Sequence, residues 1–211
     1  MPIVYEIRRK HTHVVVWEVS ETNEKLLQML DLDTEKQSKF DTLTDKRKRE
    51  YLGIRACFHY LSIEGDILYE ESGKPYIKSN HHISISHSWG KVAFTISKFA
   101  VGIDIEKNRP QKIRNIQHKF IRKDEESFIE EQKLDDYLHV IWGIKESQYK
   151  LHDGNLWSFL NHYRVQSFQY NRDDKVICEI IDKEHHTQYY TAYYERIKDG
   201  FYLIYVLDNI L

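Results

Sequence analysis

Short strand-like segments occur in both halves of this 211-residue chain, and each half also contains segments with helical periodicity. In the first half, β-branched and aromatic runs predict strands at 14–19, 82–86, 91–97 and, at the midpoint, 101–107. Apolar spacing predicts helices at 22–32 and 44–61 there, and at 113–120, 124–133 and 136–151 in the second half. Further strands are expected at 163–169, 175–181, 187–195 and 201–207. Helices grouped between turn-linked strands indicate the α+β class.

The pattern divides the chain near residues 98–101 without a visible linker. Only 3 Pro and 8 Gly interrupt the chain, so the elements should be continuous. We therefore expect an N-terminal α+β half at 1–99 and a C-terminal α+β half at 100–211 that pack tightly together.

The composition excludes several classes of protein. The 31 basic and 33 acidic residues give a net charge of −2, which argues against a globally basic nucleic-acid binder. No stretch approaches the ~18 consecutive apolar residues of a membrane span. The first residues carry charges where a signal peptide needs an apolar core, so a cytoplasmic protein is expected. Cys57 and Cys178 lie far apart and form no Cys-x-x-Cys motif, which favours buried, reduced thiols.

The most informative segment is the strand predicted at 101–107, which alternates strictly. Val101, Ile103 and Ile105 share one face, whereas Asp104 and Glu106 share the other. Two carboxylates at this spacing can converge on one ion, and oxygen ligands suit Mg²⁺. The alternative is a solvent-facing strand edge with two ordinary acids.

A second segment, at 142–150, carries a carboxylate between two lysines. On a helix, Trp142, Glu146 and Lys150 fall on one face, with Lys145 at its flank. An acid that holds an ion beside lysines that neutralise phosphate oxygens suits a metal–phosphate complex. The alternative is a surface Glu–Lys pair.

A third segment, at 83–88, ends a strand with a Ser86-His87-Ser88 cluster. A nucleophilic Ser–His pair is disfavoured because adjacent residues point to opposite faces and no nucleophile elbow is present. A zinc site from His81, His82 and His87 lacks the usual spacing. Two interpretations are left: the segment forms hydrogen bonds to a bound phosphate, or it is an ordinary hydrogen-bonded loop end.

A fourth segment is the basic run at 46–49, with Arg55, at the start of a predicted helix. Clustered positive charge attracts phosphate groups, although a solvated helix face is the alternative. Basic residues at a helix N-terminus oppose the macrodipole, which favours a role in ligand binding.

Taken in order, these segments resemble a known family. Gly73-Lys74-Pro75, then 85–88, then 102–106 and Trp142-x-x-Lys145-Glu146-x-x-x-Lys150 are similar to the motifs of 4′-phosphopantetheinyl transferases of the surfactin-synthetase-activating type. The resemblance runs from about residue 36 to 160. It implies the fold of that family, with two similar α+β halves packed as a pseudo-dimer.

The resemblance also implies a reaction. A serine of an acyl or peptidyl carrier protein attacks the pyrophosphate of coenzyme A, phosphopantetheine moves to the serine, and adenosine 3′,5′-bisphosphate leaves. Coenzyme A and the carrier protein would be the partners of a monomer that binds neither nucleic acid nor a membrane. Mg²⁺ is the expected cation, with Mn²⁺ as an alternative.

Site residues follow from the same resemblance. Asp104, Glu106 and Glu146 match the metal ligands, and Lys150 and Lys145 match groups that hold the phosphates. Contacts to the nucleotide end of coenzyme A are matched by Lys74, Ser86, His87, Arg49, Lys36 and Lys39. Glu125 matches an acid near the incoming serine; it, Glu146 or a metal-bound water would be the base.

Two rival functions are open. A non-catalytic module could bind coenzyme A or RNA through the run at 46–49 and the tyrosines. A metal-dependent phosphohydrolase could use the same carboxylates with water as the nucleophile.

Overall fold

The fold comes from a computed structural model that describes residues 2–30, 32–152 and 156–208. The first half begins with two strands, β1 (Ile3–Arg9) and β2 (Thr12–Glu18). Three helices follow, α1 (Asn23–Leu30), α2 (Thr34–Asp41) and α3 (Asp45–Tyr60). The half ends with the short strands β3 (Leu68–Tyr69) and β4 (Pro75–Tyr76) and the hairpin of β5 (His82–Ser88) and β6 (Lys91–Ser97).

The second half begins with β7 (Val101–Lys107) and α4 (Pro110–Ile116). Three 3₁₀ turns, η1 (Gln117–Lys119), η2 (Glu126–Phe128) and η3 (Glu131–Lys133), lead into the long helix α5 (Leu134–Leu151). The strands β8 (Tyr163–Val165), β9 (Val176–Ile181), β10 (Thr187–Ile197) and β11 (Phe201–Leu207) complete the half.

The two halves repeat one topology. The first sheet has the order β1-β2-β6-β5 and the second the order β7-β11-β10-β9-β8, all antiparallel. In each half, one strand is followed by helices and then by a hairpin. The last strand of the hairpin pairs with the strand that precedes the helices: β6 pairs with β2, and β11 pairs with β7. This arrangement confirms the predicted α+β class.

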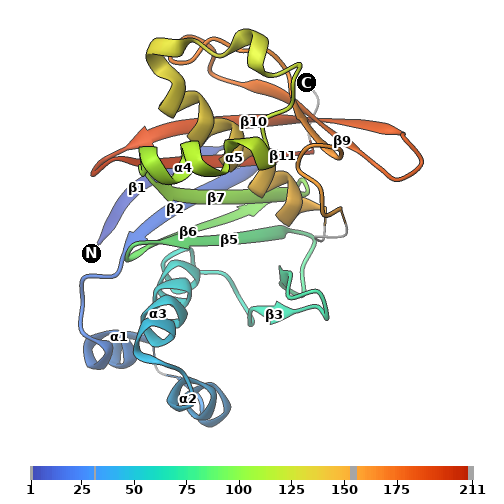
Figure 1. Cartoon of the computed structure of the whole chain (residues 1–211). Helices are drawn as coiled ribbons and strands as arrows, with labels where there is room; N and C mark the ends of the chain where they lie inside the picture. The colour runs from blue at the N-terminus through green and yellow to red at the C-terminus, as the bar shows by residue number, and fades with distance from the viewer. Residues whose placement is uncertain (1, 31, 153–155, 209–211) are drawn as a thin grey trace.

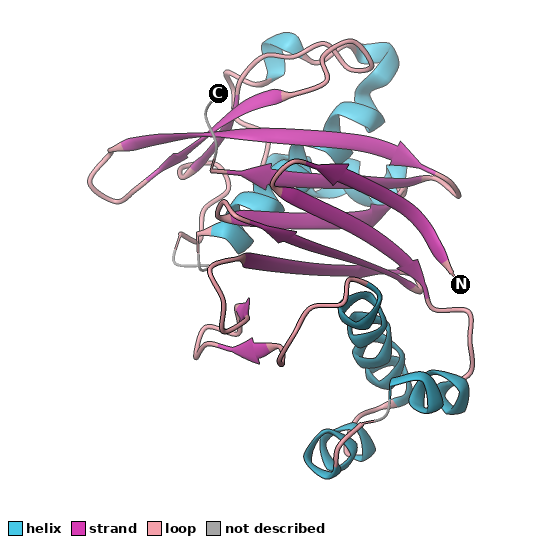
Figure 2. Ribbon diagram, turned by 180° about the vertical axis from the view of Figure 1, so that it is seen from behind, coloured by secondary structure: helices cyan, strands magenta, loops and turns pink. Residues whose placement is uncertain are grey.

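The molecule is layered, with helices outside two stacked sheets (Figures 1 and 2). One face of the first sheet packs under α1–α3, with Trp17 and Phe94 in that core. Its opposite face meets the second sheet, where Val14, Val16 and Ala93 contact Ile103 and Leu203. The far face of the second sheet packs against α5. The predicted alternation in β7 is confirmed, because Val101, Ile103 and Ile105 all lie in the core between the sheets.

Serines join the edge strands of the two sheets. Ser84, Ser86 and Ser88 are all buried on β5, on the side of the strand that faces β7. Ser84 Oγ accepts from Ile103 N–H at 3.1 Å, and Ser88 Oγ accepts from Lys107 N–H at 3.3 Å. The open edge of β7 is thereby satisfied by side chains rather than by another strand.

Gly102 sets the distance between β7 and α5. A Cβ at this position would lie 1.8 Å from the backbone oxygen of Ser147. Because the obstacle is helix backbone, no side chain can be accommodated there without moving α5. This close approach brings the helix over Asp104 and Glu106, which are on the same face of β7 as Gly102.

The structure differs from the sequence predictions in several segments. β1 and α2 were not expected, because β1 lacks the alternation of a half-buried strand and α2 is largely polar and buries only Phe40. The helix predicted at 124–133 is wrong: the segment forms η2 and η3, which leave Glu125 turned into the interior. The helix predicted at 22–32 ends at Leu30, and residue 31 lies outside the described residues.

Two further expectations concern membrane-spanning helices and the cysteine thiols. Among the described residues, α5 is the longest helix, and no helix has the apolar length that a membrane crossing requires. Cys57 and Cys178 are both buried and free, and burial raises the pKa of each thiol. The predicted buried, reduced thiols are confirmed.

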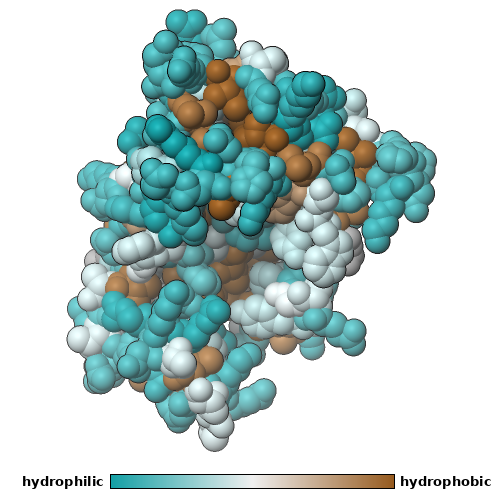
Figure 3. Space-filling view, in the orientation of Figure 1, coloured by the Kyte–Doolittle hydropathy of each residue, from teal (hydrophilic) through white to brown (hydrophobic). Residues whose placement is uncertain are grey.

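The face shown in Figure 3 is mostly hydrophilic, with hydrophobic side chains gathered in its upper part.

Candidate active site

A cavity of about 370 Å³ lies where β5, β7, α4 and α5 meet. Most of the acids and bases that the sequence analysis singled out line it together: Ser86 and His87 from β5, Asp104 and Glu106 from β7, and Glu146 and Lys150 from α5. We call this space the central cavity. The first half supplies two of these side chains and the second half four, so neither half forms the cavity alone.

A network of hydrogen bonds joins Asp104 and Lys150 at the wall of the central cavity. Lys150 Nζ donates at 2.9 Å to each of three oxygens: Asp104 Oδ1, Ser86 Oγ and the Ile103 carbonyl. Ser86 Oγ in turn donates to Asp104 Oδ1 at 2.9 Å. One oxygen of Asp104 is therefore fully engaged, and the ammonium group is fixed at the cavity wall.

The other oxygen of Asp104 is left unused. Asp104 Oδ2 is buried and has no hydrogen-bond partner within the part of the chain that the structure describes. A buried carboxylate oxygen without a partner is costly, unless a ligand completes it. Oxygen donors of this kind suit Mg²⁺, so the residues present fit a divalent cation.

Glu146 supports the same interpretation. The pKa of Glu146 is raised to about 7, mainly by burial and also by the negative charge of Asp104, while Lys150 opposes the shift. Glu106 adds a smaller effect in the same direction as Asp104. A bound cation would stabilise carboxylates whose negative charges repel one another in this way.

Glu106 is held by partners that the sequence analysis did not include. Arg109 pairs with Glu106 Oε1, and Ser88 Oγ donates to Glu106 Oε2 at 3.3 Å. His139, on α5, fixes this corner: its Nε2 accepts from Arg109 N–H at 3.1 Å, and its Nδ1 donates to the Asp135 carbonyl at 2.6 Å. The imidazole also stacks on Tyr202, and burial lowers its pKa, which favours this neutral ring.

His87 lies on the opposite face of β5 from Ser86, as the strand period predicts. Its side chain is 37% exposed and otherwise covered, and its Nδ1 lies 3.3 Å from Glu50 Oε1 on α3. Burial of the ring lowers the pKa of His87, and Glu50 opposes the shift. A Ser–His nucleophile pair is thereby excluded for Ser86 and His87, since Ser86 donates instead to Asp104.

Glu125 and Lys145 are buried and are not among the described residues that line the central cavity, so their contact with the substrate stays a prediction. Lys145 is 0% and Glu125 1% exposed, and Lys145 Nζ pairs with Glu125 Oε2 at 2.8 Å. Lys145 also donates to the Phe120 carbonyl at 2.6 Å, while Glu125 Oε1 accepts from Val165 N–H at 2.8 Å. Each bond of this pair joins groups of the second half, so the pair stabilises the packing of α5 against the segment before it.

The residues that are expected to contact the nucleotide lie in several different places. Lys74 lies in a neighbouring cavity beside the β3–β4 turn, where its Nζ donates to the Leu151 carbonyl at 2.9 Å. Arg49 lines another, at the β5–β6 turn, and donates to the carbonyls of Val19 and Glu21. Lys36, on α2, pairs with Asp33, which caps the start of that helix, and with Asp66, which lies just before β3. Lys39, also on α2, lies over the ring of Tyr69. The structure does not bring Lys36 and Lys39 to the central cavity; their contact with the nucleotide stays a prediction.

Three basic residues among those that line the cavity were not predicted from the sequence: Arg109, Lys112 and His139. Arg109 and Lys112 directly follow the β7 carboxylates, so their proximity in sequence was the available signal. His139 is seven residues before Glu146, two helical turns along α5, which is the same helix face.

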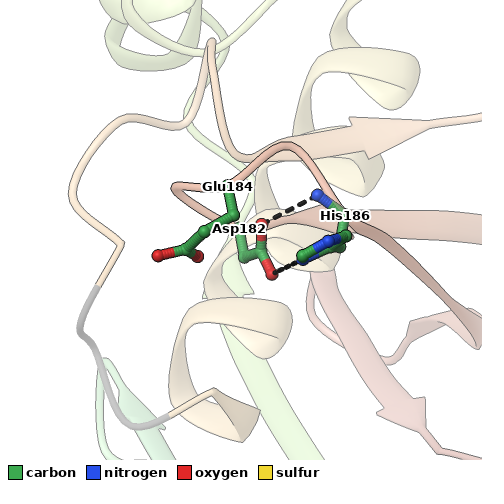
Figure 4. A group of neighbouring side chains, drawn as sticks. All are labelled: Asp182, Glu184 and His186. Carbon is green, nitrogen blue, oxygen red and sulfur yellow. Dashed lines mark hydrogen bonds and ion pairs between the residues drawn. The ribbon is translucent and has the colours of Figure 1, made fainter.

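A second group of potential metal ligands lies at the β9–β10 turn. Asp182, Glu184 and His186 bring one ligand atom each within 4.8 Å of one another (Figure 4). Asp182 already accepts from His186 N–H at 2.8 Å and lies 3.1 Å from its Nδ1, which is the hydrogen bonding of a tight turn. Glu184 and His186 are exposed, and every bond in the group serves the turn itself, so it is not a second candidate centre.

Comparison with known proteins covers the segment that carries the central cavity. The sequence model of the 4′-phosphopantetheinyl transferase superfamily matches residues 100–205. A 4′-phosphopantetheinyl transferase, ffp, of Bacillus subtilis is 33% identical over 131 residues, which cover 60% of this chain and 56% of that protein. The 4′-phosphopantetheinyl transferase Sfp of Bacillus subtilis is 32% identical over a segment with the same coverage. The protein gsp of Aneurinibacillus migulanus, another 4′-phosphopantetheinyl transferase, is 29% identical over 61% of this chain and 54% of its own length.

The matched segments thus span about half the length of these relatives. The family match alone includes β7, α5 and every strand of the second sheet, and hence Asp104, Glu106, Glu146 and Lys150. Half of the chain is covered by that match, and the chain belongs to the 4′-phosphopantetheinyl transferase superfamily.

Proposed function

We propose that this protein transfers the 4′-phosphopantetheine group of coenzyme A to a serine of an acyl or peptidyl carrier protein, in a reaction that requires Mg²⁺. The observation that carries the proposal is the unpartnered, buried Oδ2 of Asp104, in a cavity that also contains Glu106, Glu146 and Lys150. The names of the curated relatives support the same reaction.

The three carboxylates of the central cavity would hold the cation. When bound, Mg²⁺ neutralises pyrophosphate oxygens and stabilises the negative charge of the leaving group. Lys150 contributes a fixed positive charge, because its contacts with Asp104, Ser86 and Ile103 hold the ammonium at the wall. Arg109 and Lys112 supply further positive charge on the α4 side of the cavity.

The chemical step needs a base and an in-line attack. The serine oxygen of the carrier forms a bond to the phosphorus that bears pantetheine, and the bond from that phosphorus to the bridging oxygen breaks. Adenosine 3′,5′-bisphosphate leaves with the electron pair of the broken bond. We assign the serine proton to Glu146, since Glu146 lines the central cavity, whereas Glu125 is buried elsewhere in the second half.

Both halves would be needed in one chain. Ser86 and His87 come from the first sheet, whereas the carboxylates come from the second, so a single chain contains a whole cavity. This arrangement supports a monomer as the active species.

The test is a labelling panel. The purified protein is incubated with coenzyme A, Mg²⁺ and apo carrier proteins from fatty-acid, polyketide, peptide-synthetase and lysine pathways. We expect at least one carrier to gain the mass of one phosphopantetheine, located on a single serine by fragmentation mass spectrometry. No mass gain on any carrier would contradict the proposal.

A reaction without carrier serves as the control and separates the rival functions. Phosphate or adenosine bisphosphate released at the same rate without any carrier would indicate a phosphohydrolase. Coenzyme A bound tightly, with no turnover in any mixture, would indicate a non-catalytic binding module.

A further inference from the structure

His139 is a buried side chain to which the proposed reaction gives no role. It lies on α5, two helical turns before Glu146, and it is 1% exposed. Both of its ring nitrogens have partners: Nδ1 lies 2.6 Å from the Asp135 carbonyl oxygen, and Nε2 lies 3.1 Å from Arg109 N. Because a carbonyl can only accept, Nδ1 carries the proton and Nε2 is the acceptor for Arg109 N–H.

The ring of His139 also lies against the strand position next to Glu106. Tyr202, on β11, is the direct partner of Glu106 in the antiparallel register. The imidazole stacks on the Tyr202 ring, with 4.7 Å between the ring centroids and 13° between the planes. The Tyr202 hydroxyl donates to Asp136, which is on the same helix as His139. These contacts tie α5 to the sheet at the level of Glu106.

The hydrogen bond to His139 fixes the path of the chain directly after β7. Asn108 N–H donates to the Gly200 carbonyl at 2.7 Å, and Arg109 N–H donates to His139. Pro110 then begins α4. Both amides between β7 and α4 are therefore anchored, and this sets the direction from which the Arg109 side chain reaches Glu106.

The position of Arg109 matters because it is a cation beside the carboxylates proposed to hold another cation. Its guanidinium pairs with Glu106 Oε1, but its Nε is buried and has no hydrogen-bond partner within the described part of the chain. A guanidinium that is free to turn can pair with Asp104 or Glu146 instead and neutralise the charge that the metal ion needs. Held where it is, Arg109 leaves Glu106 able to bind an ion, since each carboxylate oxygen has two lone pairs.

His162 offers a contrast within the same half. It is also partly buried, and its Nδ1 lies 2.9 Å from the Ile181 carbonyl oxygen. It is not among the described residues that line the central cavity. A substitution of His162 therefore removes a comparable bond between a histidine and the backbone without touching Arg109 or Glu106.

We propose that His139 is a positioning residue that sets the affinity of the central cavity for its divalent cation, by holding Arg109 and, through it, Glu106. The inference rests on the proposed function, since it takes the cation as part of the site. Groups that orient metal ligands from outside the coordination sphere commonly change metal affinity or activity about 10- to 100-fold when they are lost.

The experiment measures the affinity for Mn²⁺ by electron paramagnetic resonance without coenzyme A, so that neither transfer nor a carrier is needed. His139→Phe keeps a flat ring against Tyr202 but cannot accept from Arg109 N–H, and it should weaken Mn²⁺ binding about 10- to 100-fold. His162→Phe is the matched control and should bind as the wild type does. Equal affinities of His139→Phe and the wild type would overturn the role of His139.

A matched pair of amides tests the hydrogen bond itself, and it serves also if His139→Phe does not fold. The carbonyl oxygen of Gln at position 139 extends as far as Nε2 does, whereas that of Asn, one methylene shorter, reaches only the place of Nδ1. His139→Gln should therefore bind Mn²⁺ more tightly than His139→Asn. Equal affinities of the two variants would show that the bond to Arg109 does not set the affinity, and would overturn the inference.

The dependence of transfer on Mg²⁺ separates positioning from a purely structural role. The Mg²⁺ concentration for the half-maximal labelling rate of His139→Phe should rise by a similar factor, and excess Mg²⁺ should restore labelling. A lower thermal unfolding midpoint with unchanged metal affinity would mean that His139 only stabilises the fold, and would overturn the inference.

Failure of the inference and failure of the proposed function look different. Wild-type protein that labels a carrier but binds Mn²⁺ no more tightly than His139→Phe overturns only the role of His139. Wild-type protein that labels no carrier and binds no Mn²⁺ overturns both.

Discussion

Replacing Asp104 by asparagine should lower kcat/KM for phosphopantetheine transfer by at least about 100-fold. The amide keeps the size of the side chain and can still accept from Ser86 and Lys150, but it removes the negative charge beside the unpartnered oxygen. Loss of a cation ligand removes charge stabilisation worth several kcal/mol in the transition state, and each 1.36 kcal/mol is about tenfold in rate.

The measurement is the initial rate of carrier labelling at saturating Mg²⁺, with the thermal unfolding midpoint recorded for the same samples. Asp182→Asn is the matched control, because it makes the same chemical change in the group at the β9–β10 turn. It should label at the wild-type rate. Full activity of Asp104→Asn would remove Asp104 from the metal site.

Replacing Lys145 by methionine should lower the free energy of unfolding by about 3–5 kcal/mol. The substitution leaves Glu125 as a buried charge without its ammonium partner, which is the costly half of a broken buried ion pair. Lys145 also ties the carbonyls of Phe120 and Phe159 to α5, so those bonds are lost as well.

Urea unfolding followed by circular dichroism measures this change. Arg114→Met is the control, since Arg114 pairs with Asp135 on the surface, at 2.6 Å and 2.8 Å, where pairs contribute about 0–1 kcal/mol. The double variant Lys145→Met/Glu125→Gln should recover part of the loss, because no buried charge is left. The structural role would be wrong if Lys145→Met cost no more than Arg114→Met, or if Glu125→Gln stopped transfer without changing stability.

Much of the central cavity could be predicted from local period. The alternation in β7 placed Asp104 and Glu106 on one face, and the helical spacing in α5 placed Trp142, Glu146 and Lys150 on another; the structure brings these faces together. Both patterns depend only on 2.0- and 3.6-residue periods, which tertiary contacts did not alter. The alternation of Ser84, Ser86 and Ser88 was visible too, but its purpose required knowledge that β7 is the neighbour of β5.

The roles of Lys145 and Glu125 could not be found in the same way. Lys145 is one residue from Glu146 and therefore points to a different side of α5, and its partner is 20 residues away on a segment predicted to be helical. That segment is instead two 3₁₀ turns, because burying Glu125 against Lys145 overrides local helical preference. A contact between distant residues, rather than any local pattern, decides this part of the fold.

The elements β1 and α2 could not be predicted for a related reason. β1 is half-exposed along most of its length and pairs only with β2, so its sequence shows little of the alternation that a half-buried strand would have. α2 buries only Phe40 and is stabilised locally, with Asp33 capping it through Lys36 N–H. Neither element contributes to the central cavity, so the functional prediction did not depend on them.

The proposed reaction requires a divalent cation held by Asp104, Glu106 and Glu146, and direct binding of Mn²⁺ tests this requirement most simply. Titration of Mn²⁺ followed by electron paramagnetic resonance should give one tightly held ion per chain, bound more tightly with coenzyme A present. Asp104→Asn should abolish this ion, whereas Asp182→Asn should retain it. Mn²⁺ binding that survives Asp104→Asn and disappears in Asp182→Asn would contradict the account.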